Sequence, residues 1–225
     1  MALENQSALP LRLVLLGRTT RLMMIKLHKF AACAALIFFS LSTPNASAAV
    51  EGWTNWRGPH QAGRSDATDL PKSIKLSGAG NNLLWTHDIA GRGHPVIGNG
   101  RVFTWGYRGK GPDLQEVLLC LNEADGKTIW EHGYNDYLSD TVYSRYTVGA
   151  PTIDPATGWV YLMTTNGGVK CFDANGKMQW EYSLMERFGR LTFPNGRTGA
   201  AVIDGDLVIV RGVTSYWGKQ GPARD

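Results

Sequence analysis

The stretch Leu118-Leu-Cys-Leu-Asn-Glu-Ala-Asp-Gly-Lys-Thr-Ile-Trp-Glu131 occurs twice in this chain. Its second copy is Val169-Lys-Cys-Phe-Asp-Ala-Asn-Gly-Lys-Met-Gln-Trp-Glu181, which has one residue fewer in its loop. The tryptophans of the two copies, Trp130 and Trp180, are separated by 50 residues. A repeat of about that length, built from short strands and tight turns, is typical of stacked β units such as propeller blades.

Each copy has the pattern of a β-hairpin. Leu119 and Leu121 alternate with other residues, as a strand requires. The dipeptides Asp125-Gly126 and Asn175-Gly176 predict two-residue hairpin turns, since such turns need positive φ. A single hairpin is unstable in water, so each copy is expected to stack on a neighbour.

A second kind of repeat precedes the first along the chain. Pro95–Phe103, Pro151–Tyr161 and Ala201–Ile209 each read as a short strand, a turn that contains glycine, and a β-branched or aromatic strand. The two kinds together give four strands per blade, with a first blade at about 94–133 and a second at about 148–184.

The predicted fold is therefore all-β, a β-propeller of four-stranded blades within residues 81–225. It is incomplete, with about two full blades and the first hairpin of a third, which begins near residue 199. Closure needs at least four blades, so we expect the chain to be the N-terminal part of a longer protein.

Residues at equivalent positions of the repeats are expected to form its core. Cys120 and Cys171 occupy neighbouring repeats and are interpreted as small buried residues, because such positions usually lie too far apart for a disulfide. The repeated tryptophans are interpreted as packing residues rather than sugar-binding platforms. The predicted core positions are Trp85, Trp130, Trp180, Cys120 and Cys171.

Residues 1–48 have the features of an export signal. A basic region ends at Lys29, the apolar run Ala31–Leu41 is too short to span a membrane, and Ala46-Ser-Ala48 is a cleavage motif. We predict a periplasmic or secreted protein with no transmembrane span after cleavage; an uncleaved anchor helix is the alternative. The true start codon could be Met1, Met23 or Met24.

Composition and charge limit the classes of partner that the protein could bind. The chain has 225 residues, of which 43% are hydrophobic and 27 are glycine, as in a β-rich globular protein. Its net charge of +4 lies wholly in residues 1–48, so the remainder is neutral. A neutral body gives no support for a nucleic-acid partner. Residues 49–80 follow no regular pattern and are interpreted as a lead-in segment whose tryptophans pack on the first repeat.

The repeated segment, with its Asp-Gly-Lys or Asn-Gly-Lys turn and its tryptophan, resembles the pyrroloquinoline-quinone-like (PQQ-like) β-propeller repeat. The paired strand at Pro95–Phe103 also fits, and Trp56-Arg-Gly-Pro59 with Leu70-Pro71 resembles the opening of secreted bacterial members. The resemblance covers about 53–212. WD40 and kelch repeats fit less well, because the chain has no Trp-Asp strand end and no repeated Gly-Gly.

The resemblance implies one of two functions. Some members are dehydrogenases that hold the quinone and calcium; others are scaffolds, such as the lipoprotein of outer-membrane barrel assembly. Adjacent cysteines, typical of the dehydrogenases, are missing from this sequence. We expect a non-catalytic scaffold for a protein partner in the cell envelope, without cofactor or metal and able to self-associate through open blade edges. The alternative is the N-terminal part of a dehydrogenase that uses PQQ with calcium, and a non-functional fragment is the third possibility.

Arginines recur just before the first strand of each blade. The loops there should open onto one end of the central channel, where repeated arginines could receive an anion. The competing interpretation is that each arginine pairs locally and holds its loop. The predicted ligand-binding residues are Arg92, His94, Arg145, Tyr146 and Arg197. We assign no catalytic residue, and the aspartates in turns are interpreted as turn formers rather than metal ligands.

Overall fold

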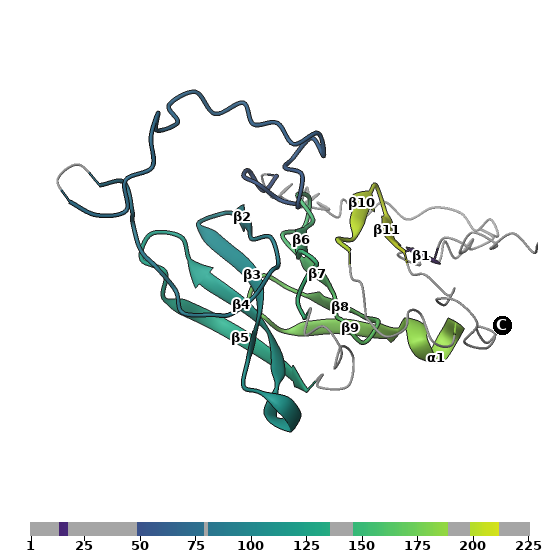
Figure 1. Ribbon diagram of the computed structural model, residues 1–225. Coiled ribbons are helices and arrows are strands. Elements are labelled where there is room, and N and C mark those ends of the chain that lie inside the picture. Colours follow the sequence, from purple (N-terminus) through teal and green to yellow (C-terminus); the bar gives the residue numbers. More distant parts are fainter. Residues whose placement is uncertain (1–13, 18–48, 79–80, 136–145, 189–198, 212–225) are drawn as a thin grey trace, which may run out of the picture.

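The computed structural model describes residues 14–17, 49–78, 81–135, 146–188 and 199–211 (Figure 1). These residues form antiparallel sheets, and the described helix is limited to the 3-10 turn η1 (Gly111–Asp113) and to α1 (Leu184–Phe188). The predicted all-β class is confirmed. In the described ranges, no helix has the length and apolar character needed to cross a membrane.

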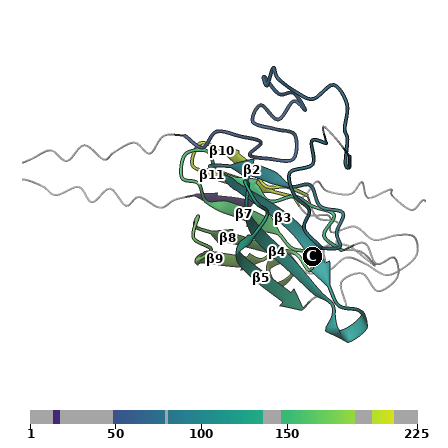
Figure 2. The same ribbon diagram turned by 90° about the vertical axis from the view of Figure 1, so that its left-hand side faces the viewer.

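Two complete blades follow one another along the chain. Each is a four-stranded sheet whose strands pair in sequence order, so every connection is a hairpin. The first blade contains β2 (Val96–Gly98), β3 (Arg101–Arg108), β4 (Gln115–Asn122) and β5 (Thr128–Asn135). The second contains β6 (Thr152–Ile153), β7 (Val160–Met163), β8 (Gly168–Phe172) and β9 (Met178–Ser183). Figure 2 shows the sheets one behind the other.

The third sheet contains β10 (Val202–Asp204) and β11 (Leu207–Val210), the predicted first hairpin of a third blade. The strand β1 (Val14–Gly17) pairs antiparallel with the other edge of β11. It thus takes the place that β4 and β8 have in the complete blades. Because β1 lies inside the predicted signal peptide, cleavage before Ala49 would remove it. The signal peptide itself remains a prediction.

The turns of the repeated hairpins differ from the predicted type. At Asn99-Gly100 both residues have positive φ, 52° and 71°, as in a two-residue turn. At Asp125-Gly126 and Asn175-Gly176 only the glycine does, at 70° and 84°. Each of these loops is longer and is accompanied by a shift in strand register, as in hairpins with a bulge. The prediction of two-residue turns there was wrong.

In the two longer turns, the glycines Gly126 and Gly176 leave room for a tryptophan side chain to pack on the turn. Trp85 Nε1 donates to Glu123 O at 2.7 Å, across the turn of the first blade. Trp130 Nε1 donates in the same way to Ala174 O in the second blade, at 3.2 Å. A Cβ at Gly126 would lie 2.5 Å from the Trp85 ring. A Cβ at Gly176 would lie 2.7 Å from the Trp130 ring, so each tryptophan lies directly on a glycine.

A buried carboxylate adds a second connection between the blades. Glu116 on β4 is fully buried and accepts hydrogen bonds from the backbone N–H of Thr147 at 2.9 Å and of Thr165 at 3.2 Å. The hydroxyl of Thr165 donates to the same carboxylate. Burial of a carboxylate is costly unless its oxygens are hydrogen-bonded, and three donors meet that need, one from the chain before β6 and two from the β7–β8 turn.

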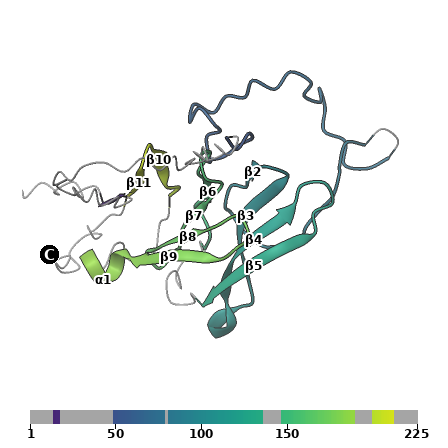
Figure 3. The ribbon, with the colours of Figure 1, turned by 180° about the vertical axis from the view of Figure 1, so that it is seen from behind.

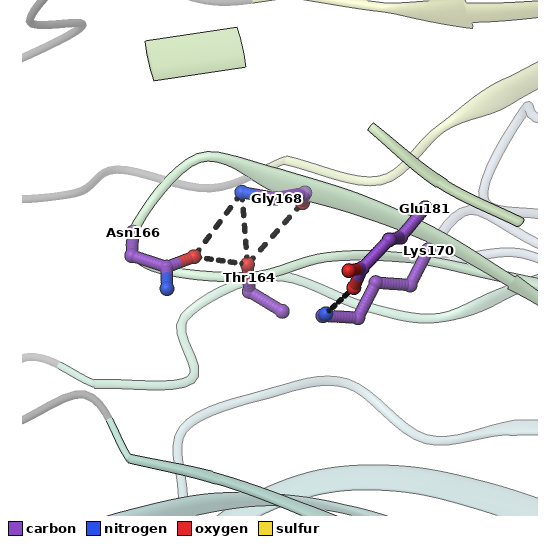
Figure 4. A network of polar contacts seen from close by, with 5 residues as sticks. All are labelled: Thr164, Asn166, Gly168, Lys170 and Glu181. Atoms are coloured by element: carbon purple, nitrogen blue, oxygen red, sulfur yellow. Dashed lines mark hydrogen bonds and ion pairs between the residues drawn. The ribbon is translucent and has the colours of Figure 1, made fainter. Parts of the chain in front are cut away.

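Side chains of the second blade organise its β7–β8 turn and form an ion pair on its sheet (Figure 4), and one of them also contacts the first blade. In the β7–β8 turn, Thr164 Oγ1 donates to Asn166 Oδ1 at 2.5 Å and accepts from Gly168 N at 2.9 Å. Farther along β8, Lys170 pairs with Glu181 at 2.5 Å and lies 4.3 Å from the ring centre of Tyr134 on β5. This lysine therefore binds its own blade and the one before it.

The repeat core lies between the sheets. Cys120 and Cys171 are fully buried and form no disulfide, and each lies opposite the repeated tryptophan of its hairpin, Trp130 or Trp180. Burial in apolar surroundings raises the pKa of the Cys120 thiol to about 11. The two thiols thus occupy equivalent positions in consecutive blades.

Candidate functional site

The lead-in segment crosses the inner strands of both complete blades. Trp53 O accepts a hydrogen bond from Ile97 N at 2.9 Å, and Thr54 O accepts one from Ile153 N at 2.8 Å. From there the segment loops away from β2 and β6 (Figures 1 and 3). Trp53 is partly buried, as predicted for the lead-in tryptophans, whereas Trp56 is 57% exposed, so the packing prediction was wrong for it.

The turn after Trp53 forms one wall of a cavity of about 540 Å³. The opposite walls come from the chain before β6 and from the third sheet. The lining side chains with polar or aromatic groups are Asn55, Trp56, Arg57, Gln61 and Arg211. The rest of the lining is residues 148–150, 199–202 and 209–210, which are mostly small or apolar.

The cavity has a positive character. Arg57 and Arg211 contribute two guanidinium groups, and the described residues of the lining include no aspartate or glutamate. Two arginines without a neighbouring carboxylate suit an anionic ligand group, because each guanidinium can bind a carboxylate through two hydrogen bonds. The exposed indole of Trp56 adds a flat apolar surface beside them.

The wall that carries Arg57 is held by local hydrogen bonds. Asn55 Oδ1 accepts from Arg57 N at 3.0 Å, and Arg57 O accepts from Gly63 N at 2.8 Å. Gln61 has a φ of 52° and donates its backbone N–H to Gly58 O at 3.0 Å. A non-glycine residue with positive φ is sparsely populated and is often found at functional sites.

The predicted ligand-binding residues have different outcomes. Arg145 and Arg197 lie outside the described residues. His94 is exposed and its ring stacks on Trp53 at a centroid distance of 6.3 Å, while Arg92 is exposed on the same segment. Tyr146 is buried and packs against Tyr107. Arg92, His94 and Tyr146 do not line the cavity, and the predicted arginine ring remains a prediction.

Sequence reasoning missed Arg57 and Arg211 as candidates. It selected arginines just before the first strand of each blade, whereas Arg57 belongs to the lead-in and Arg211 follows β11. The available signal was the segment Trp56-Arg-Gly-Pro59, which was noted only for its resemblance to family members.

The dehydrogenase alternative requires calcium. Among the residues that the structure describes, no group of three or more His, Cys, Asp or Glu side chains could hold a metal ion. The arginine cavity could pair with acid groups of a quinone, and its described lining residues carry no carboxylate for a cation.

Comparison with known proteins identifies the family to which the repeats belong. Among curated proteins no match was found. Among solved structures, the chain is similar to quinohemoprotein alcohol dehydrogenase from Comamonas testosteroni, with 23% identity and a TM-score of 0.38. That match covers 56% of this chain and spans only 19% of the enzyme's chain. Residues 63–219, more than two thirds of this chain, match the family described as outer membrane protein assembly factor BamB. The chain therefore belongs to this family of PQQ-like repeat β-propellers.

Proposed function

We propose that this protein is an exported, non-catalytic scaffold that binds a protein partner in the cell envelope. The observation that carries the proposal is the cavity lined by Trp56, Arg57 and Arg211, in which none of the described lining residues is acidic. The family description supports an envelope setting, because it names an outer-membrane assembly factor. A periplasmic or secreted location and the absence of a cofactor are parts of the same proposal.

The chemistry of the cavity favours an acidic segment of the partner. Carboxylates on that segment would pair with Arg57 and Arg211, and an apolar or aromatic side chain would lie on the exposed indole of Trp56. Tryptophan and arginine are the residues that most often dominate binding energy at interfaces. We therefore place the partner site on the lead-in side of the second and third sheets.

Photo-crosslinking in the cell envelope tests this placement. A photoreactive phenylalanine analogue replaces Trp56, and in the control variant it replaces Leu84, which is 84% exposed and outside the cavity lining. We expect one defined protein adduct from the Trp56 position and none from the Leu84 position. The double change Arg57→Glu and Arg211→Glu should abolish the adduct. An adduct that survives this charge reversal would show that the cavity does not recognise the partner by charge.

A quinone-dependent dehydrogenase is the second candidate, since the acid groups of PQQ would also pair with Arg57 and Arg211. The test adds PQQ and calcium to the exported protein and follows tryptophan fluorescence together with dye-linked oxidation of simple alcohols. Saturable binding with dye reduction would overturn the scaffold proposal. Binding without turnover would assign the cavity to a small carboxylate ligand, and no binding would leave the protein partner.

A further inference from the structure

Three large aliphatic side chains close together in the lead-in are exposed to solvent. Ile74 is 80% exposed, and Leu70 and Leu76 are each 65% exposed. They belong to the lead-in, which arches away from the sheets before it returns to the first blade (Figures 1 and 3). Single exposed hydrophobic residues are common on protein surfaces, whereas a group of them on one projecting segment points to an interaction surface.

Two lysines alternate with these aliphatic residues. Lys72 and Lys75 are exposed, and neither forms an ion pair with a residue that the structure describes. Between Asp69 and Asp88 the sequence has no aspartate or glutamate. Residues 70–76 therefore combine an apolar surface with positive charge that no neighbouring acidic residue in the sequence offsets.

The side chain of Asn82 fixes the shape of this segment. Its Oδ1 accepts a hydrogen bond from Lys75 N at 2.8 Å, and its Nδ2 donates one to Ser73 O at 2.7 Å. The backbone N–H of Asn82 donates to Lys75 O at 2.9 Å. These bonds satisfy three backbone groups beside Ile74, which lowers the cost of bringing the segment into an apolar environment.

We propose that residues 70–76 bind the surface of an anionic phospholipid bilayer. The three aliphatic side chains enter the interfacial region of the lipid, and the two lysines lie among the phosphate groups. Apolar side chains together with lysines hold peripheral segments on anionic bilayers, because burial of apolar area and attraction to the lipid charge act together. This surface is separate from the Arg57–Arg211 cavity, and the inference does not depend on the proposed function.

Two other occupants fit the segment less well. A second copy of the chain in a symmetric contact would bring the lysines of both copies together, and no carboxylate between Asp69 and Asp88 could pair with them. A protein partner usually buries about 800 Å² on each side, and one segment with three aliphatic side chains is small for such an interface. A bilayer requires no complementary cavity, because lipids rearrange around the side chains that enter it.

The test follows position 74 in the full chain. An environment-sensitive fluorescent amino acid replaces Ile74, and in the matched control it replaces Ile129, which is 46% exposed on β5. The vesicles contain phosphatidylcholine alone or mixed with phosphatidylglycerol, and a quencher on the acyl chains reports entry into the lipid. We expect quenching at position 74 with the anionic vesicles and none at position 129. Because this readout is local, binding through residues 1–48 alone would not produce it.

Charge variants test the role of the two lysines. In Lys72→Gln combined with Lys75→Gln, the equilibrium constant for insertion of position 74 should fall about 25-fold, since each lysine near an anionic surface contributes about a factor of five. Lys72→Arg combined with Lys75→Arg keeps the charge, and position 74 should insert as in the original chain. These positions are exposed, so the sheets should remain folded, which circular dichroism checks.

Three outcomes would overturn the proposal. The first is that anionic vesicles do not quench the probe at position 74, and the second is that the two glutamine changes leave its quenching unchanged. The third is equal quenching at positions 74 and 129, which would show that contact with lipid does not involve this segment in particular. A photoreactive residue at position 74 that forms a defined protein adduct in cells, and no lipid adduct, would assign the segment to a protein partner instead.

Discussion

The carboxylate of Glu116 shows how one side chain can determine the stability of the contact between two blades. It is fully buried and is satisfied by donors from Thr147 and Thr165. In Glu116→Gln, one acceptor oxygen becomes an NH₂ group that faces backbone N–H donors. We expect the free energy of unfolding to fall by about 1–3 kcal/mol, the cost of leaving buried polar groups unsatisfied. Urea denaturation monitored by circular dichroism measures this change.

The matched control is Glu123→Gln, at an exposed carboxylate in the β4–β5 turn. A surface substitution of this kind should stay within about 0.5 kcal/mol of the original chain. Equal stability of the Glu116→Gln variant and the original chain would show that the three hydrogen bonds contribute no net stability.

The buried thiol of Cys120 should make the folded protein less stable at alkaline pH. Its pKa rises from the ordinary 9.0 to about 11 because burial disfavours the thiolate. Between these pH values the unfolded chain releases the thiol proton and the folded chain keeps it, so unfolding becomes easier as pH rises. The stabilising contribution is complete below pH 9 and decreases by about 1.4 kcal/mol per pH unit toward pH 11.

The measurement is the free energy of unfolding from pH 7 to 11 for the original chain and for Cys120→Ala. The difference between the two should shrink above pH 9, because the variant has no thiol at this position. A difference that stays constant over the whole range would show that the thiol titrates alike in both states. Burial also raises the pKa of Tyr134. Because this residue is present in both proteins, its effect cancels in the difference between them.

In the hairpins, substitutions at two glycines can separate the free-energy cost of backbone strain from the cost of displacing a docked tryptophan. Gly100 and Gly126 have nearly the same φ, 71° and 70°. A Cβ at Gly100 would meet nothing within 4 Å, whereas at Gly126 it would lie 2.5 Å from Trp85. Gly100→Ala should cost about 1–2 kcal/mol for the left-handed backbone alone. Gly126→Ala should cost about 1–3 kcal/mol more, since the Trp85 ring must move.

Thermal and urea unfolding of the two variants gives both costs on one scale. Equal destabilisation would mean that Trp85 yields freely and that its packing on the turn adds little. The indole fluorescence of Trp85 offers an independent readout, which should change in Gly126→Ala and remain unchanged in Gly100→Ala.

The hairpins also show how far sequence reasoning reaches. The strands, their order and the repeated tryptophans were predictable, because period-two patterns and turn residues are local signals. The turn type was not, since Asn99-Gly100 and Asp125-Gly126 have similar chemistry but different φ values at the first residue. That difference comes from the register of the paired strands and the bulge at Cys120, which only the folded sheet determines.

The candidate site was less predictable than the fold for a related reason. Repeat position selected Arg92, Arg145 and Arg197, because equivalent loops of a propeller are expected to meet at its central channel. The cavity instead joins Arg57 with Arg211, which are far apart in the chain and belong to different kinds of segment. Nothing local in the sequence relates them; the lead-in brings them together only by crossing both blades.

In the whole molecule, we expect the third sheet to open first. The two complete blades should open only at a higher free energy, and as one unit. Glu116 and Trp130 join the first blade to the second, and the facing strands carry fully buried side chains such as Leu118 and Val160. On β10, by contrast, Val202 is 37% exposed, and a groove of about 350 Å³ between Trp180 of the second blade and the third sheet removes part of the packing. Local stability follows buried apolar contact, so opening free energies should be lower in the third sheet.

Hydrogen–deuterium exchange resolved by peptide measures this order directly. We expect amides of β4 and β8 to exchange at least tenfold more slowly than those of β10 and β11. If β10 and β11 exchange as slowly as β4, the third sheet is as stable as the complete blades despite its smaller buried contact.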